Sequence, residues 1–221
     1  ELYGAKIVVV HDSTASLLPA MASALRSWQN NPDAMYVVGS VAGPSPYPRM
    51  VRTWASVIGR IAKQQFKHIT GKAPSTLFCV CGGGSNLMSM AYPLLKDKTE
   101  IFAVESAGEG ISTGRHGATI LGGSKMGILL GFKSKVVMKS AQIAESLTEA
   151  SGLDFAAVGP EVAYLHDIGR IKFRSTTDLE AKKTFLMCSQ KLGIIPEVLL
   201  VCLIFYLIAH LFTLIEYKTL Q

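Results

Sequence analysis

The stretch Thr76-Leu77-Phe78-Cys79-Val80-Cys81-Gly82-Gly83-Gly84-Ser85-Asn86 decides the fold of this chain. A short apolar run that ends in three glycines is typical of a buried strand entering a tight loop, and Leu87–Leu95 predicts a helix directly after it. Glycine lets backbone N–H groups come close to an anion, and a helix N-terminus adds free N–H donors and the positive end of its dipole. Gly82 to Asn86 therefore predict a phosphate site; the alternative is a structural turn without a ligand.

A second loop is expected beside this corner. Gly39-Ser40 follows Met35–Val38, a short apolar segment that predicts a strand. Loops after parallel strands gather at one edge of a sheet, where ligands bind, so the Ser40 hydroxyl is placed to reach the same phosphate. Two nucleotide-binding alternatives fail on spacing, because the sequence has no G-x-x-x-x-G-K-[ST] motif and no G-x-G-x-x-G after its first strand.

Strand patterns alternate with helix patterns along the rest of the chain. Lys6–His11 and Ile101–Glu105 predict buried strands. Thr177 and Glu180 have the spacing of a capping box that opens a helix, and Gly193 is placed to end that helix. The alternation predicts an α/β fold with a mainly parallel sheet and flanking helices.

Two amphipathic helices are expected before the glycine corner. The first begins near Ser13 or Thr14 and tolerates Pro19 only near its first turn. A longer helix follows Pro48, with basic residues mostly opposite its apolar positions. The apolar positions of the longer helix are Met50, Trp54, Val57, Ile58 and Ile61, and its basic residues are Arg49, Arg52, Arg60 and Lys63.

Composition indicates one folded domain of ordinary size, because the 221 residues are 49% hydrophobic and 17% charged. The net charge is +6, but the basic residues are scattered and Lys182-Lys183 is their only adjacent pair. This pattern disfavours nucleic-acid binding, which needs a dense basic stripe. Cys79 and Cys81 would face the same side of a strand, so free buried thiols in a reducing compartment are favoured over a disulfide.

The C-terminal segment differs from the rest in composition. Val198–Ile215 is 18 residues without a charge, and only His210 and Thr213 interrupt its apolar run. That length reaches the ~17–25 residues of a membrane-spanning helix, and Tyr217 and Lys218 are placed to anchor one end. The segment predicts a spanning helix, a buried helix, or a terminus foreign to the parent fold, and the sequence leaves these open.

A series of motifs resembles the tryptophan synthase beta chain family. The glycine corner resembles its phosphate loop, and Gly39–Pro48 (GSVAGPSPYP) looks like its GTAAGPHPYP-type segment. Val104–Ala118 is similar to the family's V-E…G-I-x-T-G-x-H-G-A pattern, and Ser151–Pro160 to S-A-G-L-D-[FY]-P-S-V-G-P. These matches, with shorter ones up to Gly193-Ile194-Ile195-Pro196, cover nearly all of Gly4–Pro196 in order.

The resemblance implies an incomplete fold type II domain that uses pyridoxal 5′-phosphate (PLP) in condensing L-serine with indole to L-tryptophan. Residues 1–38 would be a remnant of the mobile closure domain, residues 39–196 a partial PLP-binding α/β domain, and residues 197–221 an apolar tail with a possible transmembrane helix. By resemblance, the glycine corner and Ser40 would hold the 5′-phosphate. Asp154 would help close the active site, and the carbonyls of Gly82, Phe155 and Ala157 match a monovalent-cation site.

The resemblance also implies partners and a location. Family beta chains are cytoplasmic, pair as beta–beta dimers and bind a tryptophan synthase alpha chain. Leu18-Pro19 replaces the Lys-Asp pair that the family places near its alpha-chain contact, which puts that contact in doubt. Leu129-Leu130 stands where aromatic residues line the family's indole path. The apolar tail adds membrane association as an open alternative.

The departures from the family pattern concern catalysis. The Schiff-base lysine of the family lies in an H-K-x-N motif, and this sequence contains no such motif. After Pro196 the sequence leaves the family pattern, and no role is transferred to Glu197. We therefore expect a tryptophan synthase beta-like chain without a catalytic lysine and inactive alone. The alternative is a non-catalytic, truncated or membrane-tethered module that retains only phosphate-ligand binding.

Overall fold

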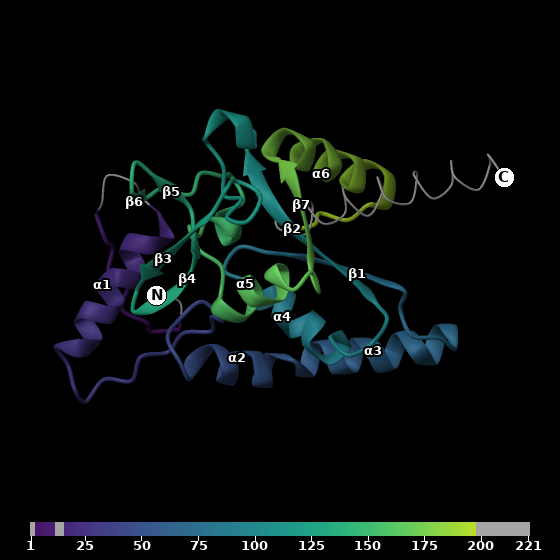
Figure 1. Ribbon diagram of the computed structural model, residues 1–221, viewed down its shortest axis with the longest axis horizontal. Helices are drawn as coiled ribbons and strands as arrows, with labels where there is room; N and C mark the ends of the chain where they lie inside the picture. The colour runs from purple at the N-terminus through teal and green to yellow at the C-terminus, as the bar shows by residue number, and fades with distance from the viewer. Residues whose placement is uncertain (1–2, 12–15, 198–221) are drawn as a thin grey trace. The chain divides into compact units, whose positions relative to one another are not determined.

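The computed structural model describes residues 3–11 and 16–197 and divides into two compact units, Glu1–Val38 and Gly39–Gln221 (Figure 1). In the first unit, helix α1 spans Leu17–Gln29, with Pro19 in its first turn as predicted. The prediction of strands at Lys6–His11 and Met35–Val38 is wrong. Neither segment pairs with a strand, and most of their apolar side chains are exposed. A strand needs a neighbour for its backbone groups, and the described residues of this unit offer none.

The second unit is organised around a three-stranded parallel sheet. Its strands are β1 (Thr76–Val80), β2 (Glu100–Gly108) and β7 (Lys172–Thr177), in the order β1-β2-β7. Both pairings are parallel, with Cys79 opposite Ala103 and Ala103 opposite Phe173. The predicted α/β fold with a parallel sheet and flanking helices is therefore confirmed.

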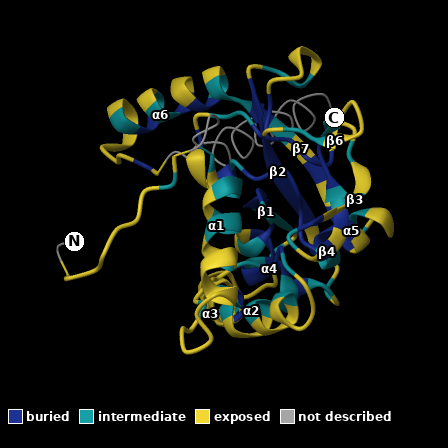
Figure 2. Cartoon of the chain, turned by 90° about the vertical axis from the view of Figure 1, so that its left-hand side faces the viewer, coloured by how far each residue is buried: buried dark blue, intermediate teal, exposed yellow. Residues whose placement is uncertain are grey.

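Helices cover both faces of this sheet. Helices α4 (Ser85–Ala91) and α5 (Pro160–Asp167) pack with one face, which carries Cys79 and Cys81. Helix α6 (Asp178–Leu192) packs with the opposite face through Ala181. Figure 2 shows the strands of the sheet largely buried, with α6 exposed along its outer side. Cys79, Cys81 and Cys188 are free and buried, and burial raises the pKa of the Cys79 thiol to about 12.

The long predicted helix forms as two, α2 (Tyr47–Ala55) and α3 (Val57–Thr70), which meet at Ser56. Between β2 and β7 the chain forms two small antiparallel hairpins and short helical turns. The first hairpin turns at Leu130-Gly131, where both residues have positive φ, as a tight hairpin turn requires. These elements are η2 (Ile111–Thr113), β3 (Lys125–Leu129), β4 (Phe132–Val136), β5 (Met138–Lys139), β6 (Gln142–Ile143) and η3 (Ser151–Leu153). A further helical turn, η1 (Tyr92–Leu94), lies between α4 and β2.

The predicted ends of α6 are both confirmed. Thr177 caps the helix: its hydroxyl accepts from Glu180 N–H, while the Glu180 side chain accepts from the N–H of Thr177. Gly193 ends the helix with φ +64°, a conformation that favours glycine.

Within residues 3–11 and 16–197, no helix has the length and apolar character needed to cross a bilayer. The apolar segment predicted at Val198–Ile215 lies outside the described residues.

Candidate functional site

The glycine corner lies where β1 passes into α4. The N–H of Cys81 donates to the carbonyl of Val104 at 2.8 Å, which holds the end of β1 against β2. Three glycines follow, and α4 begins at Ser85. The strand, loop and helix predicted from the sequence are thus confirmed, and the loop lies at the carboxyl end of a parallel strand.

Two of the three glycines are required by close packing. A Cβ atom on Gly84 would lie 2.6 Å from Val162 Cγ2, and Gly84 has φ +103°. A Cβ atom on Gly82 would lie 3.0 Å from Leu153 Cα. Side chains are therefore excluded at both positions, and the backbone is held close to α5 and η3.

Gly83 has more space around it. A Cβ atom there would meet Ala42 Cβ at 3.4 Å, Phe155 Cδ1 at 3.6 Å and Ser40 Oγ at 3.7 Å. These are ordinary contact distances, so a methyl group fits the fold, although it would occupy the space between Gly83 and Ser40. Because Gly83 has no side chain, a small open space remains beside the Ser40 hydroxyl.

The loop that contains Ser40 is bound to this corner. The N–H of Val41 donates to Ser85 Oγ at 3.1 Å, and the N–H of Ala42 donates to Ser40 Oγ at 3.0 Å. The structure thus brings Ser40 beside the corner, as predicted. The strand expected before it is absent, and the bond to Ser85 positions the loop instead.

The corner also has backbone donors to offer a ligand. Among the described residues, no acceptor is found for the N–H groups of Gly83, Gly84 and Ser85. Such orphan donors at the start of a helix need water, a side chain or an anion. Together with the hydroxyls of Ser40 and Ser85, they form a donor set suited to a phosphate dianion.

A cavity of about 390 Å³ opens at this corner, a volume within the ~300–1,000 Å³ of small-molecule sites. No lysine lines it among the described residues. Its lining residues are Phe78, Cys79, Val80, Gly82, Gly83, Gly84, Ser85, Asn86, Met90, Gly152, Leu153 and Glu197.

The segment from Asp154 to Ala157 adjoins the corner. Burial raises the pKa of the half-buried Asp154 carboxyl, and its Oδ1 has no hydrogen-bond partner in the described part of the chain. Phe155 is buried, and its carbonyl accepts a 3.5 Å hydrogen bond from Thr119 Oγ1. Ala157 is fully buried and forms an isolated bridge with Val136. Of these three residues, Phe155 lies beside the corner, with its Cδ1 3.6 Å from the position of a Cβ atom on Gly83.

Glu105 is a buried carboxylate that the sequence interpretation did not single out as a site residue. Its side chain is fully buried and accepts hydrogen bonds from the N–H groups of Ile120 at 2.8 Å and Leu121 at 3.0 Å. Burial raises the pKa of Glu105 to about 7, against the opposing effect of these backbone donors. A lone glutamate inside the apolar run of β2 is the signal that could have identified it.

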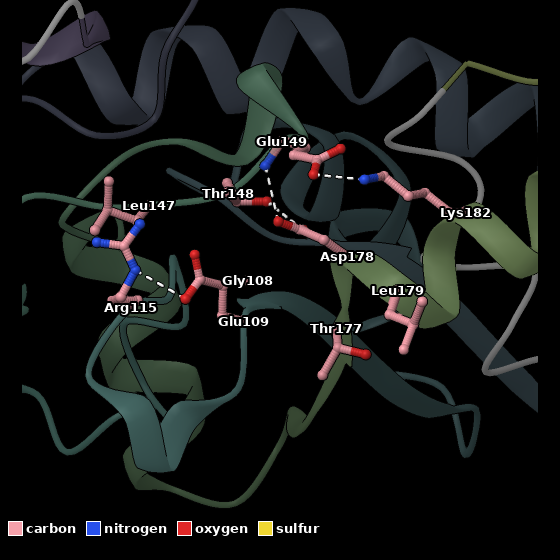
Figure 3. Close-up of a pocket in the computed structure, with 10 residues that line it drawn as sticks. All are labelled: Gly108, Glu109, Arg115, Leu147, Thr148, Glu149, Thr177, Asp178, Leu179 and Lys182. Atoms are coloured by element: carbon pink, nitrogen blue, oxygen red, sulfur yellow. Dashed lines mark hydrogen bonds and ion pairs between the residues drawn. The ribbon is translucent and has the colours of Figure 1, made fainter.

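A second cavity, of about 600 Å³, lies at the carboxyl ends of β2 and β7 (Figure 3). Its cations are already paired, Arg115 with Glu109 at 2.8 Å and Lys182 with Glu149 at 2.6 Å. The Asp178 carboxylate accepts from Thr148 Oγ1 at 2.8 Å and from the N–H of Glu149 at 3.0 Å. Its charged groups therefore satisfy one another, and the network joins the start of α6 to the segment of Thr148 and Glu149, which lies before η3.

The fold and this corner define an α/β protein with a glycine loop at the carboxyl end of a parallel strand. No protein-family model matches the sequence. The fold is shared with a fungal L-serine ammonia-lyase from Rhizomucor miehei, at a TM-score of 0.54 and 16% identity over 79% of this chain and 48% of that one. At this identity the likeness shows the fold alone.

Sequence comparison finds relatives that are similar over most of this chain. The chain is 44% identical to the tryptophan synthase beta chain of Methylobacterium nodulans over 199 residues, which are 89% of this chain and 49% of that protein. The tryptophan synthase beta chain of Rhodopseudomonas palustris is also 44% identical, over 196 residues, covering 87% of this chain and 48% of that one. The chain is therefore a partial homologue of the tryptophan synthase beta chain. It spans about half the length of these relatives.

Proposed function

We propose that this chain is a tryptophan synthase beta-type polypeptide whose glycine corner binds the 5′-phosphate of PLP. The proposal rests on the N–H groups of Gly83, Gly84 and Ser85, which have no acceptor within residues 3–11 and 16–197. They lie beside a space that a single methyl group on Gly83 would fill. The 44% identity to tryptophan synthase beta chains supports this cofactor over other phosphate esters.

The chain's own residues would bind and orient the cofactor. The N–H groups of the corner and the hydroxyls of Ser40 and Ser85 would donate to the phosphate, and Asn86 would add a side-chain amide. When bound, PLP supplies an electron sink for bond changes at an amino-acid substrate. Asp154, whose Oδ1 has no partner in the described part of the chain, would accept a hydrogen bond when the site closes over substrate.

The substrates and partners follow from the family as proposals. They are L-serine, indole and a tryptophan synthase alpha chain, with a monovalent cation on the carbonyls of Gly82, Phe155 and Ala157. We expect the 221-residue chain alone to make little or no tryptophan, because no lysine lines the glycine cavity among its described residues. The test is an assay with PLP, L-serine, indole and potassium ions. Turnover close to that of the Methylobacterium nodulans enzyme would contradict the expected inactivity of the chain alone.

A second candidate function is binding of a phosphate ligand without covalent chemistry. It is favoured by the same absence of lysine from the lining of the cavity. Pyridoxine 5′-phosphate has the ring and phosphate of PLP but no aldehyde, so it measures non-covalent binding alone. Equal affinity for the two ligands supports this candidate, whereas much stronger retention of PLP contradicts it.

A further inference from the structure

The cavity at the glycine corner has one charged side chain in its lining, and that side chain is an anion. Among the lining residues that the structure describes, Glu197 carries a carboxylate, and no lysine, arginine or histidine is present. The carboxylate therefore borders the same cavity as Gly83, Gly84 and Ser85, whose N–H groups form the candidate phosphate site. A carboxylate without a neighbouring cation is unexpected beside a phosphate dianion, because like charges repel.

Glu197 reaches the cavity from the segment that follows α6. The helix ends at Leu192, and Gly193 caps it in the left-handed conformation. Pro196 is buried directly before Glu197, which holds this segment against the second unit. Glu197 itself is exposed and also lines the cavity, so its side chain stands at the rim, where a bound ligand would meet it.

The charge of a bound phosphate would be met at this corner by neutral donors. The N–H groups of the glycine loop and the hydroxyls of Ser40 and Ser85 donate hydrogen bonds but carry no net charge. The described part of the lining adds no cation and one carboxylate. A ligand that carries its own positive group would supply the charge that the lining lacks, and that group would find its counter-charge in Glu197.

Selection by charge differs from simple repulsion in its effect on different ligands. Repulsion by a carboxylate weakens all phosphate esters alike, because each of them brings the same dianion. Attraction strengthens only an ester whose positive group lies toward the carboxylate, so it changes the ratio of two affinities. Esters that differ in a single substituent therefore separate the two effects.

We propose that Glu197 is a specificity-determining residue of the glycine cavity, which favours phosphate esters that carry a cationic group over neutral esters of the same shape. The chemical class of ligand is thus an amine-bearing phosphate ester. This inference rests on the proposed function, since it requires phosphate to bind at the glycine corner. Its own observation is the position of Glu197 in the cavity lining, and no role is transferred to this residue from the family.

The experiment compares pyridoxamine 5′-phosphate with pyridoxine 5′-phosphate, which differ only in an aminomethyl against a hydroxymethyl group. Calorimetric titration of the full 221-residue chain at low ionic strength measures both affinities. We expect the wild type to bind the amine about threefold more tightly, the size of effect that an exposed ion pair gives. Glu197→Gln should abolish this preference. Added salt should reduce it in the wild type, because exposed charges are screened.

Glu100→Gln is the matched control, because it removes the same charge at the opposite end of the sheet. Glu100 is exposed, pairs with Lys172 at 2.6 Å and lies opposite Thr76 at the start of β1, whereas the glycine corner follows the end of β1. This variant should keep the preference for the amine. Glu197→Asp retains the charge and should keep part of the preference, and thermal unfolding checks that each variant is folded.

Three outcomes overturn the inference. They are equal affinity of the wild type for the two esters, a preference that Glu197→Gln leaves unchanged, and an equal gain in affinity for both esters in Glu197→Gln. The last would show that the carboxylate only repels anions. Failure of the proposed function has a different signature, because the wild type would then bind pyridoxine as tightly as pyridoxine 5′-phosphate. Phosphate-dependent binding without a preference for the amine overturns this inference alone.

Discussion

The N–H of Val41 donates a hydrogen bond to Ser85 Oγ at 3.1 Å, across 44 residues of sequence. This bond joins the loop that carries Ser40 to the first residue of α4, so the two halves of the candidate phosphate site depend on each other. The site is therefore a property of two loops, and not of the glycine run alone.

Ser85→Ala should weaken both the fold and the site. Removing the hydroxyl leaves the N–H of Val41 unpaired and should lower the free energy of unfolding by about 1 kcal/mol. It should also lower affinity for pyridoxine 5′-phosphate, because Ser40 loses its fixed position. Chemical denaturation and calorimetric titration measure the two effects. Ser189→Ala is the control, since Ser189 Oγ bonds only to the Phe185 carbonyl of its own helix; equal losses in both variants would contradict the account.

Alanine should lower the stability of the chain at Gly84 but leave it nearly unchanged at Gly83. Gly84→Ala places a methyl group 2.6 Å from Val162 Cγ2 at a φ of +103°, so it should destabilise the chain by several kcal/mol. Gly83→Ala meets nothing closer than 3.4 Å and should leave stability nearly unchanged. Thermal unfolding of both variants checks the contrast. Similar melting temperatures for the two variants would show that the corner is not packed as described.

Glu105 should make stability fall as pH rises. Its carboxyl ordinarily titrates near 4.5 and in the folded chain near 7. Between these values the folded state binds more protons than the unfolded state, so the free energy of unfolding falls by roughly 3 kcal/mol in total as pH increases. Below this window the contribution is fully present, and above it the contribution is lost.

Glu105→Gln isolates this effect, because glutamine does not titrate. The difference in unfolding free energy between wild type and Glu105→Gln should decline from about pH 4.5 to about pH 7 and stay flat outside that window. Urea titrations at several pH values measure it. A difference that stays constant, or that grows with pH, contradicts a raised pKa at this position.

Thr177→Ala should destabilise α6 by about 1 kcal/mol, because it removes one half of the capping box and leaves the N–H of Glu180 unpaired. Thr53→Ala serves as the control, since the Thr53 hydroxyl is exposed and bonds only to the Arg49 carbonyl of its own helix. Denaturation midpoints of the two variants give the comparison. A smaller loss for Thr177→Ala than for Thr53→Ala would show that the cap contributes nothing.

The glycine corner and the capping box of α6 could be predicted because their signals are local. Three glycines between an apolar run and a helix restrict the backbone whatever surrounds them, and Thr177 with Glu180 satisfies donors within one turn. Local signals could not show whether Lys6–His11 and Met35–Val38 form strands. Their stability depends on a neighbouring strand, which an apolar pattern does not guarantee.

Other features depend on tertiary packing that the sequence does not reveal. The apolar pattern of α2 and α3 predicts helices, but it does not show which side of each helix is buried. Gly59 packs on α4 and Arg52 pairs with Glu161 of α5, and several apolar side chains on the other side remain exposed. Glu105 required knowledge of where β2 lies, because the donors of Ile120 and Leu121 reach it from a distant loop. Local patterns identified the site's position, whereas its supporting contacts came from the fold.

The most direct test of the account measures binding of pyridoxine 5′-phosphate and of pyridoxine to the 221-residue chain and to Gly83→Ala by calorimetric titration. Neither ligand has an aldehyde, so surface lysines cannot capture it. The account predicts that removing the phosphate weakens binding at least tenfold, and that Gly83→Ala causes a similar loss without lowering stability. Equal binding of the two ligands, or binding of the phosphate ester that Gly83→Ala leaves unchanged, would contradict the assignment of this corner as a phosphate site.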